Sequence, residues 1–176
     1  MDVPDPEAAS DQSEAEARLL DAERVIQARL GDQPVDFDSL HAVSNIYRAA
    51  TAVRRRAERE LLAPQGLSWG GFTIVWVLWV WGEMETAQLA SECDLAKGTL
   101  TGMVSTLEKQ QLVARTRMER DRRRVTVALT PQGRAMIEEL HPRFHRFEIE
   151  MVHDLSAEDR RSLARFLRLV ITSAER

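Results

Sequence analysis

The strongest constraint on the fold lies in residues 86–103, where two short apolar patterns flank a sharp turn. Two short helices cross steeply only if they share a small core, approach closely and are joined tightly. Ala90 is small enough for the crossing, and Asp94 stands where a tight turn favours a residue that tolerates a left-handed backbone. The sequence therefore predicts helices over Glu85–Cys93 and Ala96–Gln111 that form a helix-turn-helix. Their shared core would contain Leu89, Cys93, Leu95, Leu100, Met103 and Leu107.

The other face of the second helix carries small, hydrogen-bonding or cationic side chains. Such a face allows a helix to enter the major groove of duplex DNA, which is about 12 Å wide. An ordinary helical hairpin with a polar outer face would show the same pattern, so the pattern alone leaves both interpretations open. The candidate DNA-contacting residues on this helix are Lys97, Gly98, Thr99, Thr101 and Ser105.

A basic hairpin follows directly. Val113–Arg117 and Arg123–Leu129 read as two strands, the second with clear alternation, joined by a loop over Met118–Arg122. An arginine at such a tip can enter a narrow minor groove while others pair with phosphates. A solvated, salt-bridged charge cluster is the alternative, but the position directly after a helix-turn-helix favours DNA. The six arginines of this ribbon are Arg115, Arg117, Arg120, Arg122, Arg123 and Arg124.

The formal net charge of −4 does not exclude a nucleic-acid partner. The acidic residues gather in residues 1–38, whereas residues 96–124 are strongly basic. The local field, screened over roughly 10 Å in salt, is what steers a polyanion. A total charge of this sign therefore says little about the basic segment.

The rest of the chain predicts a mainly helical protein with a small β-hairpin wing. Residues 1–36 read as an acidic extension, disordered at first and then forming a short amphipathic helix that ends near Leu30. Residues 37–176 read as one domain, with the winged helix-turn-helix at 84–130. Further helices are expected over Ser39–Leu62, Ser68–Trp81, Pro131–His153 with a bend at Pro142, and from Ser156 onward.

Over about residues 38–174 the chain resembles the multiple-antibiotic-resistance regulator (MarR) family of bacterial transcription factors. The motifs that carry the resemblance are Gln88-Leu89-Ala90, Thr99, Leu107-Glu108, Leu112-Val113, Asp121-Arg122-Arg123, Val125 and Leu129-Thr130-Pro131-Gln132-Gly133-Arg134. The resemblance implies a MarR-like homodimer, with residues 37–63 and 131–176 as dimerisation helices. It also implies a double-stranded, pseudo-palindromic operator and a repressor whose DNA binding is modulated by a small ligand.

The same resemblance implies roles for individual residues. Arg123 would enter the minor groove and Asp121 would position it, with Arg122 beside them. We expect Lys97, Thr99 and Thr101 to read the major groove, and Arg115 and Arg117 to contact the DNA backbone. The chain departs from the family pattern at Gly102, Met103 and Thr106, where arginines are common, at Gln111, where glycine is usual, and at Ala96, which cannot cap a helix.

Four tryptophans crowd one helix and invite two interpretations. In the first, Trp69, Trp76, Trp79 and Trp81 serve core and dimer packing, helped by the amphipathic segment Glu14–Leu30. In the second, Tyr47, Trp76 and Trp79 line a pocket for a small aromatic or lipophilic ligand. The sequence favours packing and leaves the pocket open.

Other candidate sites are weaker. Cys93 could sense oxidants, but it falls on the core face of the helix pair and is expected to pack there. The spacing of His141, His145 and Glu148 could hold zinc, but Pro142 interrupts the register, so solvated or inter-subunit histidines are expected. We expect no metal, no cofactor and no enzyme activity, because no catalytic motif is present.

The remaining expectations concern location and partners. The first residues lack the pattern of a secretory signal, the apolar stretch Leu67–Trp81 is shorter than a membrane span, and a single cysteine suits a reducing compartment. These features predict a cytoplasmic protein that does not bind membranes. The alternative function is a winged-helix protein-interaction module with no specific DNA target.

Overall fold

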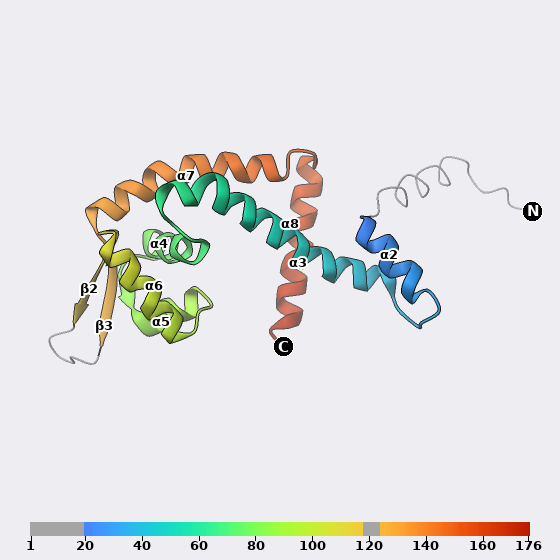
Figure 1. The fold of residues 1–176 in the computed structure, drawn as a ribbon, viewed down its shortest axis with the longest axis horizontal. Coiled ribbons are helices and arrows are strands. Elements are labelled where there is room, and N and C mark those ends of the chain that lie inside the picture. The colour runs from blue at the N-terminus through green and yellow to red at the C-terminus, as the bar shows by residue number, and fades with distance from the viewer. Residues whose placement is uncertain (1–19, 118–123) are drawn as a thin grey trace, which may run out of the picture. The chain divides into compact units, whose positions relative to one another are not determined.

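The computed structural model describes residues 20–117 and 124–176 (Figure 1). These form two units, one ending at Thr51 and the other beginning at Ala52. Helices dominate both units, and the second unit also contains a three-stranded sheet. The elements are α2 (Asp21–Leu30), α3 (Phe37–Ala57), η1 (Glu58–Leu62), η2 (Ala63–Gln65), α4 (Trp69–Trp81), β1 (Met84–Glu85), α5 (Thr86–Glu92), α6 (Lys97–Lys109), β2 (Val113–Arg117), β3 (Val125–Leu129), α7 (Pro131–Met151) and α8 (Ala157–Ala174).

In the first unit a carboxylate joins α2 to α3. The Glu23 side chain is 4% exposed and accepts hydrogen bonds from the backbone N–H of Leu20 at 2.7 Å and from Nδ2 of Asn45 at 2.6 Å. Both bonds hold the pKa of Glu23 below its ordinary value, and the bond from Leu20 has the larger effect. The amphipathic helix expected up to Leu30 is therefore present over the described residues, and it is tied to α3 by a polar contact that the sequence pattern did not reveal.

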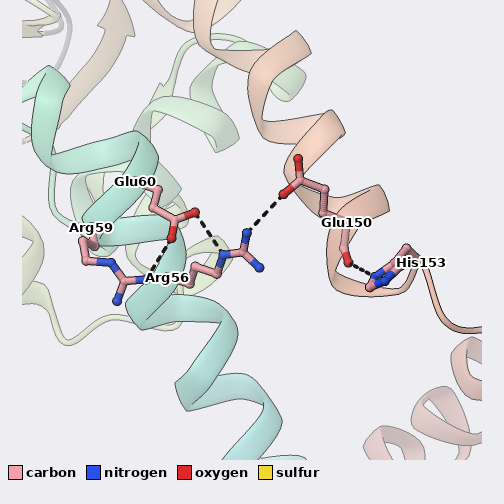
Figure 2. A network of polar contacts seen from close by, with 5 residues as sticks. All are labelled: Arg56, Arg59, Glu60, Glu150 and His153. Atoms are coloured by element: carbon pink, nitrogen blue, oxygen red, sulfur yellow. Dashed lines mark hydrogen bonds and ion pairs between the residues drawn. The ribbon is translucent and has the colours of Figure 1, made fainter.

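The helix expected through Leu62 loses its α-helical form after Ala57. A π-helical turn, η1, and a 3₁₀ turn, η2, follow. Pro64 lies in η2, and the turn ends at Gly66, which adopts a left-handed conformation at φ +67°. At this point Arg56 donates to Glu60 at 3.0 Å and to Glu150 of α7 at 3.2 Å, while Arg59 also pairs with Glu60 at 2.8 Å (Figure 2). The Arg59 and Arg56 guanidinium groups lower the pKa of the Glu60 carboxyl. This network joins the end of α3 to α7.

Helix α4 is the centre of the core. It begins as expected at Ser68, whose Oγ accepts from the backbone N–H of Gly71 at 3.2 Å, and it ends at Gly82. Six of its residues are buried, among them Ile74 and Val75 at 0% exposure, because apolar side chains surround the helix on several sides. Among the described residues no single helix is long and apolar enough to cross a bilayer, although 37–65 and α4 pass such a test as a pair.

The first wing strand forms where the sequence predicted it, the second begins at Val125 and not at the predicted Arg123, which lies outside the described residues, and a third strand joins them. β2 and β3 pair antiparallel from Val113 opposite Leu129 to Arg117 opposite Val125. The two-residue β1, which no sequence pattern indicated, pairs with the other edge of β3, with Met84 opposite Val127. Val127 is therefore the centre of the sheet and is fully buried.

Helices α7 and α8 begin at the predicted caps. Thr130 accepts from the backbone N–H of Gly133 at 3.0 Å, Ser156 accepts from that of Asp159 at 3.1 Å, and Pro142 lies inside α7. Within α8 no residue is buried in the single chain. Its exposed apolar side chains are Leu163, Phe166, Leu167, Leu169, Val170 and Ile171.

Candidate nucleic-acid interface

The turn between α5 and α6 has the geometry that the sequence predicted. Asp94 adopts a left-handed conformation at φ +50°. The backbone N–H of Asp94 donates to the carbonyl of Ser91 at 3.1 Å, and that of Leu95 donates to the carbonyl of Ala90 at 2.9 Å. These bonds satisfy the last carbonyls of α5 and turn the chain sharply into α6.

The two helices share a small apolar core. Leu89 of α5 is fully buried, and Leu100, Val104 and Leu107 of α6 are between 1% and 2% exposed. Cys93 and Leu95 pack against this core from the turn. Because the inward face of α6 is filled in this way, its orientation about its own axis is set by burial, and the opposite face lies in solvent.

The solvent face of α6 carries the predicted contact residues. Lys97, Thr99 and Thr101 are exposed. A Cβ built on Gly98 or Gly102 would meet no atom within 4 Å, so no contact in the described chain requires glycine at either position. Glycine inside a helix costs about 1 kcal/mol relative to alanine. The solvent face of α6 thus has no side chain at Gly98 and Gly102, at a cost in stability.

Ser105 is less available than its exposed neighbours. The residue is half-buried, and its hydroxyl donates to the carbonyl of Thr101 at 3.0 Å and accepts from Nη2 of Arg115 at 2.5 Å. Thr101 likewise donates its hydroxyl to the carbonyl of Lys97 at 2.8 Å, which leaves its oxygen able to accept a hydrogen bond from a partner.

The described arginines of the wing differ in their surroundings. Arg115 lies against α6, where its Nε is 3.1 Å from Oε2 of Glu108. Arg124 pairs with Glu85, with its Nε donating to Oε2 at 3.0 Å. Arg117 is exposed at the end of β2. The predicted minor-groove group Asp121, Arg122 and Arg123 lies outside the described residues.

The comparison with known proteins decides the family. The MarR family model matches residues 67–125, from two residues before α4 to the first residue of β3. The HTH-type transcriptional regulator YwaE of Bacillus subtilis (strain 168) is 34% identical over 163 residues, which cover 91% of this chain and 95% of that protein. The chain belongs to the MarR family.

Solved structures of MarR-family regulators share the fold. The Bordetella bronchiseptica regulator BpsR, solved in a study of how 6-hydroxynicotinic acid regulates its DNA binding, has a TM-score of 0.69 at 22% identity, covering 74% of this chain and 98% of that one. A mutant MarR from Escherichia coli, solved in complex with operator DNA, also has a TM-score of 0.69 at 22% identity, covering 77% and 98%. This MarR-family chain is a winged-helix transcriptional regulator of the helix-turn-helix type.

The aromatic cluster of this regulator lines a cavity that is partly open to solvent. About 290 Å³ in volume, it lies between α4 and α7. The His141 ring stacks on Trp76 with centroids 5.4 Å apart and lies 5.0 Å from Trp79. Tyr47, the third predicted ligand residue, is 71% exposed on α3 in the first unit. The lining residues are Trp69, Phe72, Thr73, Trp76, His141, Phe144 and Glu148.

The remaining candidates are the histidine pair on α7 and Cys93. His145 Nδ1 lies 3.3 Å from Oε2 of Glu148, and the described residues hold no group of three or more His, Cys, Asp or Glu side chains that could bind a metal. Burial, with Glu92 nearby, raises the pKa of the Cys93 thiol to about 11. A thiol with this pKa is almost entirely protonated near neutral pH and reacts slowly.

Proposed function

We propose that the chain acts as a homodimer that binds a pseudo-palindromic duplex operator and represses transcription until a small aromatic or lipophilic ligand releases it. The solvent face of α6 is the observation that supports this proposal. The ammonium group of Lys97 and the hydroxyls of Thr99 and Thr101 can contact base edges, and Gly98 and Gly102, which have open space around them, allow close approach. In this proposal Lys97, Gly98, Thr99 and Thr101 lie in the major groove. A repressor of this kind works in the cytoplasm, where it meets its operator.

The wing completes the proposed contact. Arg117 is exposed at the end of β2, close to where the chain enters the tip. We assign it to a phosphate, and we assign Arg122 and Arg123, positioned by Asp121, to the minor groove. Two protomers would present this set twice, so that the half-sites of the operator are one helical repeat of DNA apart, about 34–36 Å.

Exposed apolar side chains support the dimer. On α8, Phe166 is 51% exposed and Ile171 is 55% exposed, and on α3 Val43 is 50% exposed. Apolar rows on long helices call for a partner surface. A second copy of the chain supplies one, with α3, α7 and α8 as the dimerisation helices.

The aromatic cavity supports the ligand. Its volume of about 290 Å³ is close to the lower end for small-molecule sites, and its walls are aromatic except for Thr73 and Glu148. The DNA binding of BpsR is regulated by 6-hydroxynicotinic acid, and Streptomyces coelicolor PcaV was solved with its natural ligand. We place a flat ring beside Trp76, with His141 as its polar partner.

DNA binding is tested with a duplex selected by the full-length protein from a random-sequence library, with a scrambled duplex as reference. We expect affinity to fall steeply with salt and the selected duplex to bind about 10³-fold tighter or more. The variant Lys97→Gln should weaken binding, whereas the matched control Lys109→Gln, at the other end of α6, should change it little. A ratio near one would instead favour the protein-interaction module.

The ligand is tested by tryptophan fluorescence. A panel of aromatic acids, beginning with 6-hydroxynicotinic acid, is titrated into the wild-type protein and into Trp76→Phe. We expect one of the compounds to change the emission and to release DNA, and Trp76→Phe to weaken both effects together. Release of DNA by a compound that leaves the emission unchanged and acts equally on the variant would place its site elsewhere.

A further inference from the structure

A carboxylate and a guanidinium join the wing to the recognition helix. Oε2 of Glu108, in the last turns of α6, lies 3.1 Å from Nε of Arg115 in the middle of β2. Oε1 of the same carboxylate accepts a hydrogen bond from the backbone N–H of Arg115 at 3.2 Å. One glutamate thus holds both the main chain and the side chain of one strand residue.

The far end of the same guanidinium reaches the middle of α6. Nη2 of Arg115 donates to the carbonyl of Thr101 at 3.2 Å and to Oγ of Ser105 at 2.5 Å. Arg115 therefore lies along two turns of the helix and is fixed at three points. Its side chain is only 27% exposed and that of Glu108 is 35% exposed, so the pair is partly shielded from solvent.

Arg117 provides the contrast. It is two residues further along β2, so its side chain points to the same face of the sheet as that of Arg115. It is exposed, and no described residue pairs with it. The same strand thus carries one arginine that is used within the fold and one that is presented to solvent.

The second strand of the wing is held in a similar way. Immediately before β3, Arg124 forms a hydrogen-bonded ion pair with Glu85, the residue that precedes α5. Glu83 accepts from the hydroxyl of Thr126. Carboxylates outside the hairpin therefore fix both strands to the helix pair.

We infer that Glu108 and Arg115 are positioning residues that set the angle between the wing and α6, and that Arg115 does not bind a phosphate of the operator. The inference rests on the proposed DNA-binding function and replaces the phosphate contact that the sequence suggested for Arg115. A fixed angle matters because α6 and the wing tip must reach neighbouring grooves of one duplex at the same time. Glu108 serves DNA binding although its charge repels DNA.

Positioning by Glu108 and repulsion by its charge predict opposite effects on DNA binding when the charge is removed. In Glu108→Gln the protein loses a negative charge near the DNA. We expect this variant to bind the selected duplex about three- to ten-fold more weakly at every salt concentration, because the ion pair that orients the wing is lost. If Glu108 acted only as a repelling charge, the variant would bind more tightly, and the inference would be overturned.

The salt dependence separates Arg115 from Arg117. Each phosphate contact contributes about 0.9 to the slope of log affinity against log salt. Arg115→Gln should weaken binding with an unchanged slope, and Arg115→Lys should not restore it, because lysine lacks the planar fork. The matched variant Arg117→Gln should make the slope less steep by about 0.9. A slope that falls in Arg115→Gln and recovers in Arg115→Lys would identify a phosphate contact and refute the inference.

Two controls keep the outcomes distinct. Circular dichroism and thermal unfolding of each variant confirm that the helix pair is folded, and the binding of folded variants is compared with that of wild type. A wild-type protein that shows no preference for any selected duplex overturns the proposed function, and this inference with it. A wild type that binds as expected, together with a tighter Glu108→Gln, overturns the inference alone.

Discussion

Replacing Gly102 by alanine should make the protein more stable and a poorer DNA binder. Gly102 lies in the sixth position of α6, well inside the helix, with its backbone in the ordinary helical region. A Cβ at this position would meet no atom within 4 Å, so no clash opposes the substitution. Alanine restricts the unfolded chain and favours the helix, which is why it is preferred to glycine at such sites.

The size of the effect follows from these facts. Alanine in an exposed helix interior is favoured over glycine by about 0.8–1.0 kcal/mol. For a domain of this length, about 1 kcal/mol raises the melting temperature by roughly 2–4 °C. Gly98→Ala should gain less, because Gly98 stands in the first turn of α6, where the backbone N–H groups have no partner within the helix.

Urea unfolding measures the stability, and titration of the selected duplex measures the binding. We expect the midpoint of Gly102→Ala to rise while its affinity for the selected duplex falls, since the added methyl group would hold α6 away from the base edges. A protein that becomes less stable would contradict the open surroundings of Gly102. Unchanged affinity would show that α6 does not approach DNA through this position.

Three other substitutions and measurements test the packing of the same domain. Gly133→Ala should lower the free energy of unfolding by about 3 kcal/mol, because its Cβ would lie 1.9 Å from the carbonyl oxygen of Leu112; a urea midpoint equal to wild type would refute this contact. Gln111→Gly should raise the free energy of unfolding by about 0.5–1 kcal/mol, since Gln111 adopts φ +61°, and a loss of stability would show that its side chain stabilises the turn. Alkylation of Cys93 by iodoacetamide should rise with pH up to about pH 11 and stay slow near pH 8, because the thiol pKa is raised to about 11; rapid reaction at pH 8 would show an exposed thiolate.

Local chemistry made much of the fold predictable. Caps at Ser68, Thr130 and Ser156 and the left-handed turn at Asp94 depend on residues that are neighbours in the sequence, so their signals can be read directly. The alternation of apolar and polar residues over Val125–Leu129 likewise predicts a strand. The helix-turn-helix and the two long wing strands were predicted on these grounds, and the structure contains them.

The parts that were missed depend on distant partners. Two residues at Met84–Glu85 are too few to show alternation, and they form a strand only because β3 offers a free edge. The buried Glu23 depends on Asn45, which lies 22 residues away. The attachment of Arg115 to Glu108 could have been suspected from their separation of seven residues, but six arginines in one ribbon obscured which one α6 would hold.

The short strand β1 gives the molecule a mechanical link. Only Gly82 and Glu83 separate the last residue of α4 from β1, and Gly82 adopts φ +82°, a conformation that other residues rarely adopt. Because Met84 pairs with Val127 and Glu85 directly precedes α5, this strand ties the C-terminal end of α4 both to the wing sheet and to the helix pair. A displacement of that end of α4 would therefore reach the hairpin and the helix pair together.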